Sequence, residues 1–502
     1  MPSIYMFCTL GQVLSCSYPQ PESSQEPFHV FTKRERWFVI VIIGVAGLFS
    51  GLSSNIYFPA LDQIATVSIS PLIWGSFSDT IGRRPIYIAS FSVYIAANIA
   101  LSYSPNYAVL LIFRGLQAAG SASTVSIGNG VIQDISPLAE KGAFIAFYQA
   151  IRNFSIAIGP VLGGVFSEYL GFRSIFVFLL ILSSLVLAMI VLFLPETLRA
   201  IAGNGSLRLT GVYKPLIHRL INKPTAYIDA EKQKDMLPHK RVTLMTFVDP
   251  LRLLAEPDIL LNLLFGGVVY AIWSMVTSST TRLFKQSFGL SEVFLGLAFL
   301  PNGLGTIFGS AIIGKLMTRD FLAAEAAYKS THNLPADFKI GAKSLPRDFP
   351  IERARLRHLP WVSGLFVLVT ACYGFSVAVP ALDARPGWIA VPLLLQFVIA
   401  ATSNAVFALN QTIVADLCPG KGAGATAVNN LVRCSLGAAG VAVVDLLINS
   451  VGVASAFLGL AMLTVACAPL AVMNWEWGMY WRAKRANRAA RREMREMEMR
   501  KV

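Results

Sequence analysis

The most informative stretch of the sequence reads Gly75-Ser76-Phe77-Ser78-Asp79-Thr80-Ile81-Gly82-Arg83-Arg84-Pro85. Its two glycines permit close packing and a sharp turn, and Asp79 can cap a helix or pair with an arginine. Apolar segments lie on both sides, at residues 64–77 and 85–102. Because Lys and Arg concentrate in the cytoplasmic loops of membrane proteins, this stretch predicts a cytoplasmic turn between two membrane helices.

The composition of the whole chain is that of a multi-pass membrane protein. Hydrophobic residues make up 55% of its 502 residues and charged residues only 14%, and the mean hydropathy is +0.59. A bilayer core about 30 Å thick needs roughly 20 apolar residues per helix, and such runs recur along the chain. The net charge of +14 lies between these runs and in the C-terminal tail, which favours contact with lipid headgroups and argues against nucleic-acid binding.

Eleven long apolar runs are clear. They cover residues 37–58, 85–102, 107–128, 143–166, 172–194, 259–280, 293–314, 359–379, 388–411, 422–447 and 451–473. Two groups of helices around a basic linker predict a transporter of repeated halves, with its substrate site between them. The predicted parts are a cytoplasmic N-terminal tail (1–36), an N-terminal bundle (37–198), a cytoplasmic central loop (199–256), a C-terminal bundle (257–474) and a basic cytoplasmic tail (475–502).

One membrane crossing is missing from this count. The basic clusters at 33–36 and 83–84 should both be cytoplasmic, as should a loop at 315–357, yet only one full span separates the first two. The apolar piece at 64–77 would reach only about 21 Å as a straight helix, and Pro71 would kink it. The sequence therefore predicts a stunted second helix.

Three motifs carry a resemblance to a known family. The stretch 75–85 resembles the G-x-L-x-D-x-x-G-R-R loop between helices 2 and 3 of major facilitator transporters, which implies that Asp79, Arg83 and Arg84 act as a conformational latch. Residues 110–120, which include Arg114 and Gln117, resemble the fourth-helix motif of that superfamily. The third motif, Gly159-Pro160-Val161-Leu162-Gly163-Gly164, resembles the signature of its drug:proton antiporter branch.

Further stretches narrow the resemblance. Residues 53–61, 194–199, 273–277 and 427–434 are similar to fungal members of the first drug:proton antiporter family, within its quinidine-resistance and citrate-exporter group. This implies an all-α integral membrane protein with the major facilitator fold: two pseudo-symmetric helix bundles of about 12 transmembrane helices, with helix 2 truncated or missing. The family has a full second helix, so either an exon lost by splicing or gene prediction, or a real deletion that abolishes transport, would explain the departure.

The charges inside the apolar runs bear on the substrate. They are Arg114, Arg152, Arg433 and Asp445, three positive and one negative, and a cavity so lined favours an anion. Arg152 lies two helical turns before Gly159 and so on much the same helix face, although it could also extend toward the cytoplasmic interface. Arg433 and Asp445 are about 18 Å apart along one helix, too far to pair.

These observations give two sets of candidate residues. The predicted substrate-binding residues are Arg152, Asn153, Asn55, Trp273, Thr277, Asn404, Asn429 and Arg433, with helix packing an equal alternative for the uncharged ones. Asn410 and Asn430 could line the same cavity, with the same alternative. The predicted gating and coupling residues are Asp79, Arg83, Arg84, Arg114, Gln117, Gly159, Pro160, Gly163, Gly164 and Asp445, of which Asp445 is the candidate proton carrier. No metal site and no cofactor are predicted, because all five histidines lie outside the apolar runs and no CxxC pair occurs.

The resulting prediction is a secondary active transporter and not an enzyme. It would export a small organic acid such as citrate, or an anionic secondary metabolite, in a proton-coupled cycle. Two alternatives stay open: multidrug efflux of amphipathic or cationic compounds, and a non-transporting variant that lacks a complete helix 2. The predicted partners are the substrate, protons and the lipid bilayer, in a monomer that resides in the plasma membrane.

Overall fold

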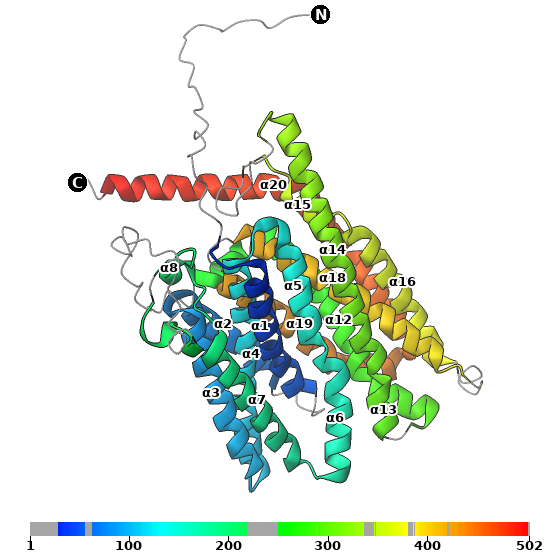
Figure 1. Ribbon diagram of the computed structural model, residues 1–502. Coiled ribbons are helices and arrows are strands. Elements are labelled where there is room, and N and C mark those ends of the chain that lie inside the picture. Colours follow the sequence, from blue (N-terminus) through cyan, green and yellow to red (C-terminus); the bar gives the residue numbers. More distant parts are fainter. Residues whose placement is uncertain are drawn as a thin grey trace, which may run out of the picture.

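The computed structural model describes residues 29–55, 63–205, 207, 209–217, 249–290, 292–335, 346, 348–379, 385, 387–418 and 422–499. Helices dominate these ranges, in which no strand occurs (Figure 1). Ten helices of the described part are long and apolar enough to cross a membrane. Residues 1–28 of the predicted N-terminal tail and 218–248 of the predicted central loop lie outside the described residues.

The first half of the chain forms one helix bundle. Its helices are α1 (Lys33–Asn55), α2 (Gln63–Ile81), α3 (Arg83–Ser102), α4 (Tyr107–Ile135), α5 (Leu138–Asn153), α6 (Ser155–Tyr169) and α7 (Arg173–Phe193). A core of large apolar side chains that includes Ile40, Tyr87 and Phe91 joins α1, α3 and α4. The outward side chains of α7, such as Ile181 and Leu185, are apolar and more than half exposed, as expected of a face toward lipid.

The second half forms the other bundle. Short segments α8 (Arg199–Ala202), η1 (Gly211–Tyr213) and η2 (Asp249–Ala255) precede it. Its helices are α12 (Pro257–Phe288), α13 (Glu292–Ala298), α14 (Leu300–Thr331), α15 (Ile351–Leu356), α16 (Leu359–Ala378), α18 (Ala390–Leu417), α19 (Gly422–Val451) and α20 (Val453–Met499). Their core is a single large apolar cluster that includes Ile272, Phe366 and Val406.

The two bundles meet along two seams. On one side α5 packs against α14 and α18, and on the other α2 and α4 pack against α19 (Figure 1). Small residues make this approach possible: a Cβ atom at Gly303 would lie 2.0 Å from the Cβ of Ala157, so a larger residue would separate α14 from α6. The space between the seams is where a central site can form.

The second helix differs in detail from the sequence prediction. α2 spans 19 residues, about 28 Å, and is not among the ten helices apolar enough to be counted as spans. The prediction of a loop at 75–85 is wrong for its first half, because Gly75–Ile81 continue α2 and the turn is confined to Gly82, whose φ is 126°. Such a sharp turn suffices because the Glu196 carboxylate accepts hydrogen bonds from the backbone N–H groups of Arg83 and Arg84, which starts α3 at once.

Three other segments differ from what the apolar pattern predicts. The predicted loop at 315–357 is wrong in its first part, because α14 continues to Thr331 through a run rich in Ala, Leu, Glu and Lys, which are strong helix formers. Residues 475–499 continue α20 in the same way. The predicted span at 143–166 is divided into α5 and α6 at Phe154, which keeps helical angles (φ −58°, ψ −24°), so the two helices follow one another without a turn.

Candidate substrate site

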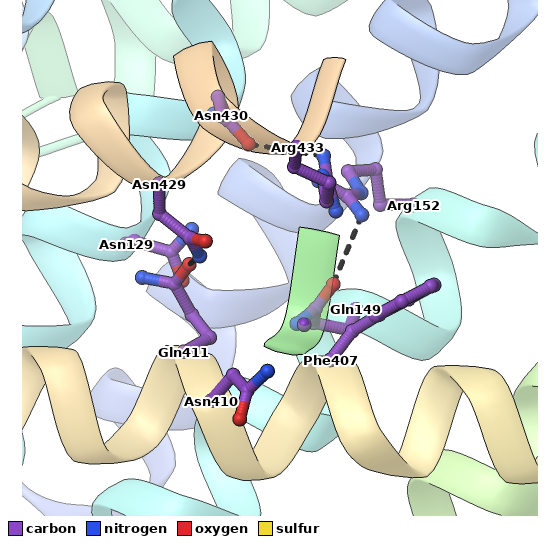
Figure 2. Close-up of a pocket in the computed structure, with 10 residues that line it drawn as sticks. Asn129, Gln149, Arg152, Phe407, Asn410, Gln411, Asn429, Asn430 and Arg433 are labelled. Atoms are coloured by element: carbon purple, nitrogen blue, oxygen red, sulfur yellow. Dashed lines mark hydrogen bonds between the residues drawn. The ribbon is translucent and has the colours of Figure 1, made fainter. Parts of the chain in front are cut away.

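A polar pocket lies between the two bundles. Its lining comes from α4 and α5 of the first half and from α12, α18 and α19 of the second (Figure 2). The lining residues are Asn129, Gln149, Arg152, Gly266, Phe407, Asn410, Gln411, Asn429, Asn430 and Arg433. A pocket shared by both halves is the arrangement expected of a transporter of repeated halves.

Arg152 enters this pocket from the last turn of α5. Its side chain is buried, so it does not extend to the membrane interface. Its Nη2 donates to Oε1 of Gln149 at 2.9 Å and to Oδ1 of Asn153 at 3.1 Å. Both partners are neutral amides, so the positive charge of Arg152 is hydrogen-bonded but not neutralised.

Arg433 enters from α19 on the opposite half. Its Nη2 donates to Oδ1 of Asn430 at 2.9 Å, and its guanidinium carbon lies 4.6 Å from the ring centroid of Tyr270 and 5.8 Å from that of Phe407. Its Nε is buried without a hydrogen-bond partner among the described residues. Aromatic faces hold a cation in place without cancelling its charge.

The pocket is therefore positively charged. None of its ten lining residues is acidic, and within the described chain neither arginine forms an ion pair with a carboxylate. A buried cation is costly unless it is paired, so an anion would complete this site. A guanidinium offers two parallel N–H groups to a carboxylate, which makes a carboxylate a suitable ligand.

The other predicted substrate residues fall into two groups. Asn429 lines the pocket, where its Nδ2 donates to Oε1 of Gln411 at 2.7 Å. The remaining ones hold helices together: Asn153 bonds Asn404 across α5 and α18, and Asn302 of α14 links Trp273 and Thr277 of α12. The side chain of Asn55, the last residue of α1, lies outside the described residues.

Sequence reasoning found part of the polar lining and missed the rest. Asn410 and Asn430 were among the polar groups expected to be able to line the cavity, whereas Asn129, Gln149 and Gln411 were not selected. A signal was present in two places, because Gln149 precedes Arg152 by one helical turn and Asn410-Gln411 interrupts an apolar run. Which of many such amides face a common pocket follows only from the helix rotations in the structure.

Asp79, Arg83 and Asp134 form a buried cluster that reaches across the two bundles. Arg83 donates through Nε to Oδ2 of Asp134 at 2.8 Å and through Nη1 to Asp79. The other oxygen of Asp79, Oδ2, accepts the backbone N–H of Gly424 at 2.8 Å, in the first turn of α19. A carboxylate is favourable at a helix N-terminus, so Asp79 connects α2 of the first half to α19 of the second.

Arg84 has a different task from Arg83. Its guanidinium donates to carbonyl oxygens at the end of α7, at 3.0 Å to Ile190 and 2.7 Å to Val191, and its Nε donates to that of Val212 at 2.7 Å. The Ile190 carbonyl also accepts the backbone N–H of Leu194. The guanidinium adds further donors at the C-terminal end of α7, where a cation is favourable, and ties α3 to that helix. These hydrogen bonds of Arg84 lie within the first half of the chain.

A second cluster joins the halves along the other seam. Lys141 of α5 pairs through Nζ with Oδ1 of Asp416 of α18 at 3.1 Å, and Arg355 of α15 pairs through Nε with Oδ2 of the same carboxylate at 2.9 Å. Arg355 also donates to the carbonyl of Leu138 at 2.8 Å, across the seam. All three charged side chains are at most 3% exposed. Together with the Asp79 cluster, this one closes the end of the molecule that carries the basic loops.

The comparisons with known proteins agree with this architecture. The sequence profile described as the Major Facilitator Superfamily matches residues 44–441. The chain belongs to the major facilitator superfamily. As a member it is a multi-pass membrane transporter of small molecules and not an enzyme.

Individual relatives are informative as well. The chain is 43% identical over 485 residues to citrate exporter 1 of Aspergillus niger, a match that covers 93% of this chain and 90% of the exporter. It is 28% identical to the MFS antiporter QDR2 of Candida albicans, with 87% and 88% covered. The crystal structure of the human organic anion transporter MFSD10 has the same fold, with a TM-score of 0.60 at 17% identity over 89% of this chain and 100% of that one.

The remaining motif residues of this major facilitator protein support its helix packing. Arg114 is buried inside the first bundle, where it donates to Oε1 of Gln117 at 2.6 Å and to the carbonyl of Ser53 at 3.0 Å. Gly159, Pro160, Gly163 and Gly164 lie in α6. α6 passes close to α13, since a Cβ at Gly296 would lie 3.4 Å from the Pro160 carbonyl oxygen. A gating or coupling role for any of these residues stays a prediction.

Asp445 does not lie in the pocket. It pairs with Arg282 of α12 at 3.0 Å, six residues before the end of α19, and its side chain is 62% exposed. The pair lies toward the opposite end of α19 from Gly424, to which Asp79 binds. A role for Asp445 in proton coupling stays a prediction.

Proposed function

We propose that this major facilitator protein is a proton-coupled exporter of a small organic acid, working as a monomer in the plasma membrane. The observation that carries the proposal is the pair Arg152 and Arg433, which meet in one pocket with only neutral partners. One arginine comes from each half, so a dicarboxylate or tricarboxylate would bridge the halves. Binding would then favour closure around the substrate, as alternating access requires.

The similarity to a citrate exporter supports the substrate class, and the similarity to an antiporter supports exchange against an ion. The cationic lining disfavours the alternative of efflux of cationic drugs, since a cation in this pocket would meet two buried like charges. Asp445 is the proposed proton carrier, because it is a carboxylate within a membrane span and pairs with Arg282 of a neighbouring helix.

The first test is citrate export from membrane vesicles under a pH gradient, with Arg152→Ala and Arg433→Ala. Each change removes charge-assisted hydrogen bonds worth about 1.5–3 kcal/mol, so we expect export to fall roughly tenfold to a hundredfold. Arg152→Lys keeps the charge without the planar fork and should fall between wild type and alanine. Arg353→Ala, at an exposed ion pair away from the pocket, is the matched control and should export normally.

Two results would contradict this function. If the alanine variants exported citrate normally while a cationic drug depended on them, the multidrug alternative would replace it. If the wild type exported nothing, the chain would be the non-transporting variant that the short α2 suggests.

A specific observation favours keeping the non-transporting variant as the second candidate. The alignment to the citrate exporter extends over 485 positions, but the 93% of this chain that it covers is only about 467 of 502 residues. The exporter therefore has residues without a counterpart here. Comparing transcript and genomic sequence between Ala65 and Ser70 tests it. An in-frame coding stretch of about 25 residues, enough for the apolar length of a span, would identify the short α2 as a splicing or gene-prediction product.

A further inference from the structure

Most polar side chains of the pocket satisfy one another. Gln149 accepts from Arg152, and Asn430 accepts from Arg433. Gln411 accepts from Asn429 and donates to Thr426 at 2.8 Å. At the cationic end of the pocket, formed by Arg152 and Arg433, guanidinium N–H groups therefore remain available. At the opposite, amide end, most side chains are paired with one another.

Two asparagines are exceptions. Both terminal atoms of Asn410, Nδ2 and Oδ1, are buried without a hydrogen-bond partner among the described residues, and so is Oδ1 of Asn129. Both side chains line the pocket and are only 2% exposed (Figure 2). Because both atoms of Asn410 are free, the conclusion is the same whichever way its amide is turned. Buried polar groups in proteins are almost always paired, so these two sites await a ligand.

The backbone opposite Asn410 leaves space for its amide. A Cβ atom at Gly266 of α12 would lie 1.9 Å from Nδ2 of Asn410, so any larger residue there would displace the side chain. Gly266 itself lines the pocket. The glycine therefore allows Asn410 to present its amide to the pocket.

The chemistry of the free atoms specifies their ligand. Amide oxygens accept hydrogen bonds, so two free amide oxygens need a donor from the ligand. An ionised carboxylate has only acceptors and cannot supply one. An alcohol hydroxyl donates once and accepts as well, so it can give its proton to Oδ1 of Asn129 or Asn410 and accept from Nδ2 of Asn410.

We propose that the substrate is a hydroxy acid, with its carboxylates on Arg152 and Arg433 and its hydroxyl on Asn410 and Asn129. The proposal rests on the function proposed above, that the pocket binds a small organic anion. It adds that the transporter selects a hydroxylated polycarboxylate over the same carbon skeleton without the hydroxyl. Sites built to bind a hydroxyl reject such analogues strongly, because the buried polar groups are then left unpaired.

The test compares two acids in the wild-type protein. Citrate and tricarballylate share three carboxylates on one skeleton, and only citrate has a hydroxyl; malate and succinate are a second such pair. We expect export of the hydroxylated member to be favoured by about tenfold or more in each pair. The same preference should appear as tighter binding to the purified protein, measured by thermal shift in detergent.

Variants at the amide end locate the effect. Asn410→Leu has a similar volume and no hydrogen-bonding atoms, so it should lower citrate export more than tricarballylate export and bring their ratio toward one. Gly266→Ala should do the same through displacement of Asn410. Arg152→Ala is the contrasting variant, since it should lower the export of both acids alike.

The possible outcomes test the hydroxy-acid proposal separately from the organic-acid export on which it rests. Equal export of citrate and tricarballylate by the wild type would overturn the hydroxy-acid proposal and leave organic-acid export standing. So would tricarballylate export that rises to the citrate level at lower pH, because a protonated carboxyl would then be the donor. Export of neither acid, with no effect of Arg152→Ala on any transported compound, would overturn the proposed function itself.

Discussion

At the scale of single residues, the buried arginines differ in what surrounds them. Arg83 has two carboxylates, Arg84 has the carbonyls at a helix end, and Arg114 has an amide, a carbonyl and the ring of Phe176 at 5.8 Å. Arg152 and Arg433 have only amides and rings in a pocket. The first three are therefore satisfied by the protein, and the last two are left for a ligand.

The motif at 110–120 assigned Arg114 to gating, and Arg152 and Arg433 were assigned to the substrate, but the charge pattern alone does not separate the three. Each is an arginine in an apolar run, and the cost of burying charge applies equally to all. What separates them is the partner contributed by another helix, such as the Ser53 carbonyl for Arg114. Contacts between distant segments leave no mark in a local pattern, which is also why the sequence left substrate contact and helix packing as equal alternatives for Asn404 and Trp273.

His29 gives a pH-dependent prediction outside the membrane spans. Its ring is buried against Gly205 and stacks on Phe31 at 4.1 Å, and the backbone N–H of Val30 donates to the carbonyl of Asn204. Burial, then the charges of Arg199 and Arg36, lowers the pKa of His29 to about 4. The docked segment holds the neutral ring, so docking is fully stable above the ordinary pKa of 6.5 and weakens as pH falls from there toward 4.

Hydrogen exchange of residues 29–36 measures this docking. We expect protection at pH 7.5 and a progressive loss of it at pH values from 6.5 down to 4. His29→Gln carries no titrating ring, so its exchange, corrected for the chemical rate, should not change across this range. Equal pH dependence in the wild type and the variant would show that another group controls the segment.

At the scale of elements, the two halves repeat the same charged arrangement. Arg83 begins α3 and pairs with Asp134 near the end of α4, and Arg355 precedes α16 and pairs with Asp416 near the end of α18. In each half a basic residue at the third helix thus binds an acidic one at the end of the fourth. Of these four residues the motif at 75–85 predicted only Arg83, because residues 350–360 do not repeat that motif closely enough to be seen.

The sequence also did not predict how far helices continue beyond their apolar runs. Hydropathy shows where a segment meets lipid, and it does not show where a helix ends. Beyond Met473, α20 continues across one end of the bundle (Figure 1). It presents a row of arginines spaced by three: Arg482 pairs with Glu352 at 2.8 Å, Arg485 with Asp258 at 3.1 Å and Arg488 with Glu256 at 2.6 Å.

The stability of this row should follow its burial. Arg482 and Glu352 are 11% and 0% exposed, so Arg482→Ala leaves a buried carboxylate unpaired and should cost roughly 3 kcal/mol. Arg488 and Glu256 are 50% and 19% exposed, so Arg488→Ala, in the same row, should cost about 1 kcal/mol or less. Thermal unfolding in detergent measures both variants. Equal shifts in Tm would mean that α20 is not held by its buried pair.

At the scale of the whole molecule, the structure is closed at the end from which an exporter must take its substrate. The Asp79 cluster and the Lys141 cluster join the halves along both seams at this end. Both must separate when the substrate enters, since the halves move as bodies around a central site. The sequence predicted the two-bundle fold and one of these clusters, and the other emerged only from the seam between α5 and α18.

A reversible cross-link at each seam tests this movement. A Cβ at Gly142 of α5 would lie 3.2 Å from the Cβ of Met317 of α14, and one at Gly75 of α2 would lie 3.3 Å from the Cβ of Ala427 of α19. Disulfides need Cβ atoms roughly 3.5–4.5 Å apart, which small shifts of the helices provide. In a background without native cysteines, Gly142→Cys with Met317→Cys, and separately Gly75→Cys with Ala427→Cys, should each form a disulfide in the closed state and stop export. Dithiothreitol should restore export, and each single cysteine should have no oxidant-dependent effect. Because either disulfide joins the two halves where the charged clusters join them, full export by a completely cross-linked protein would mean that this end stays closed throughout the cycle, and the proposed entry of substrate between the halves would then be wrong.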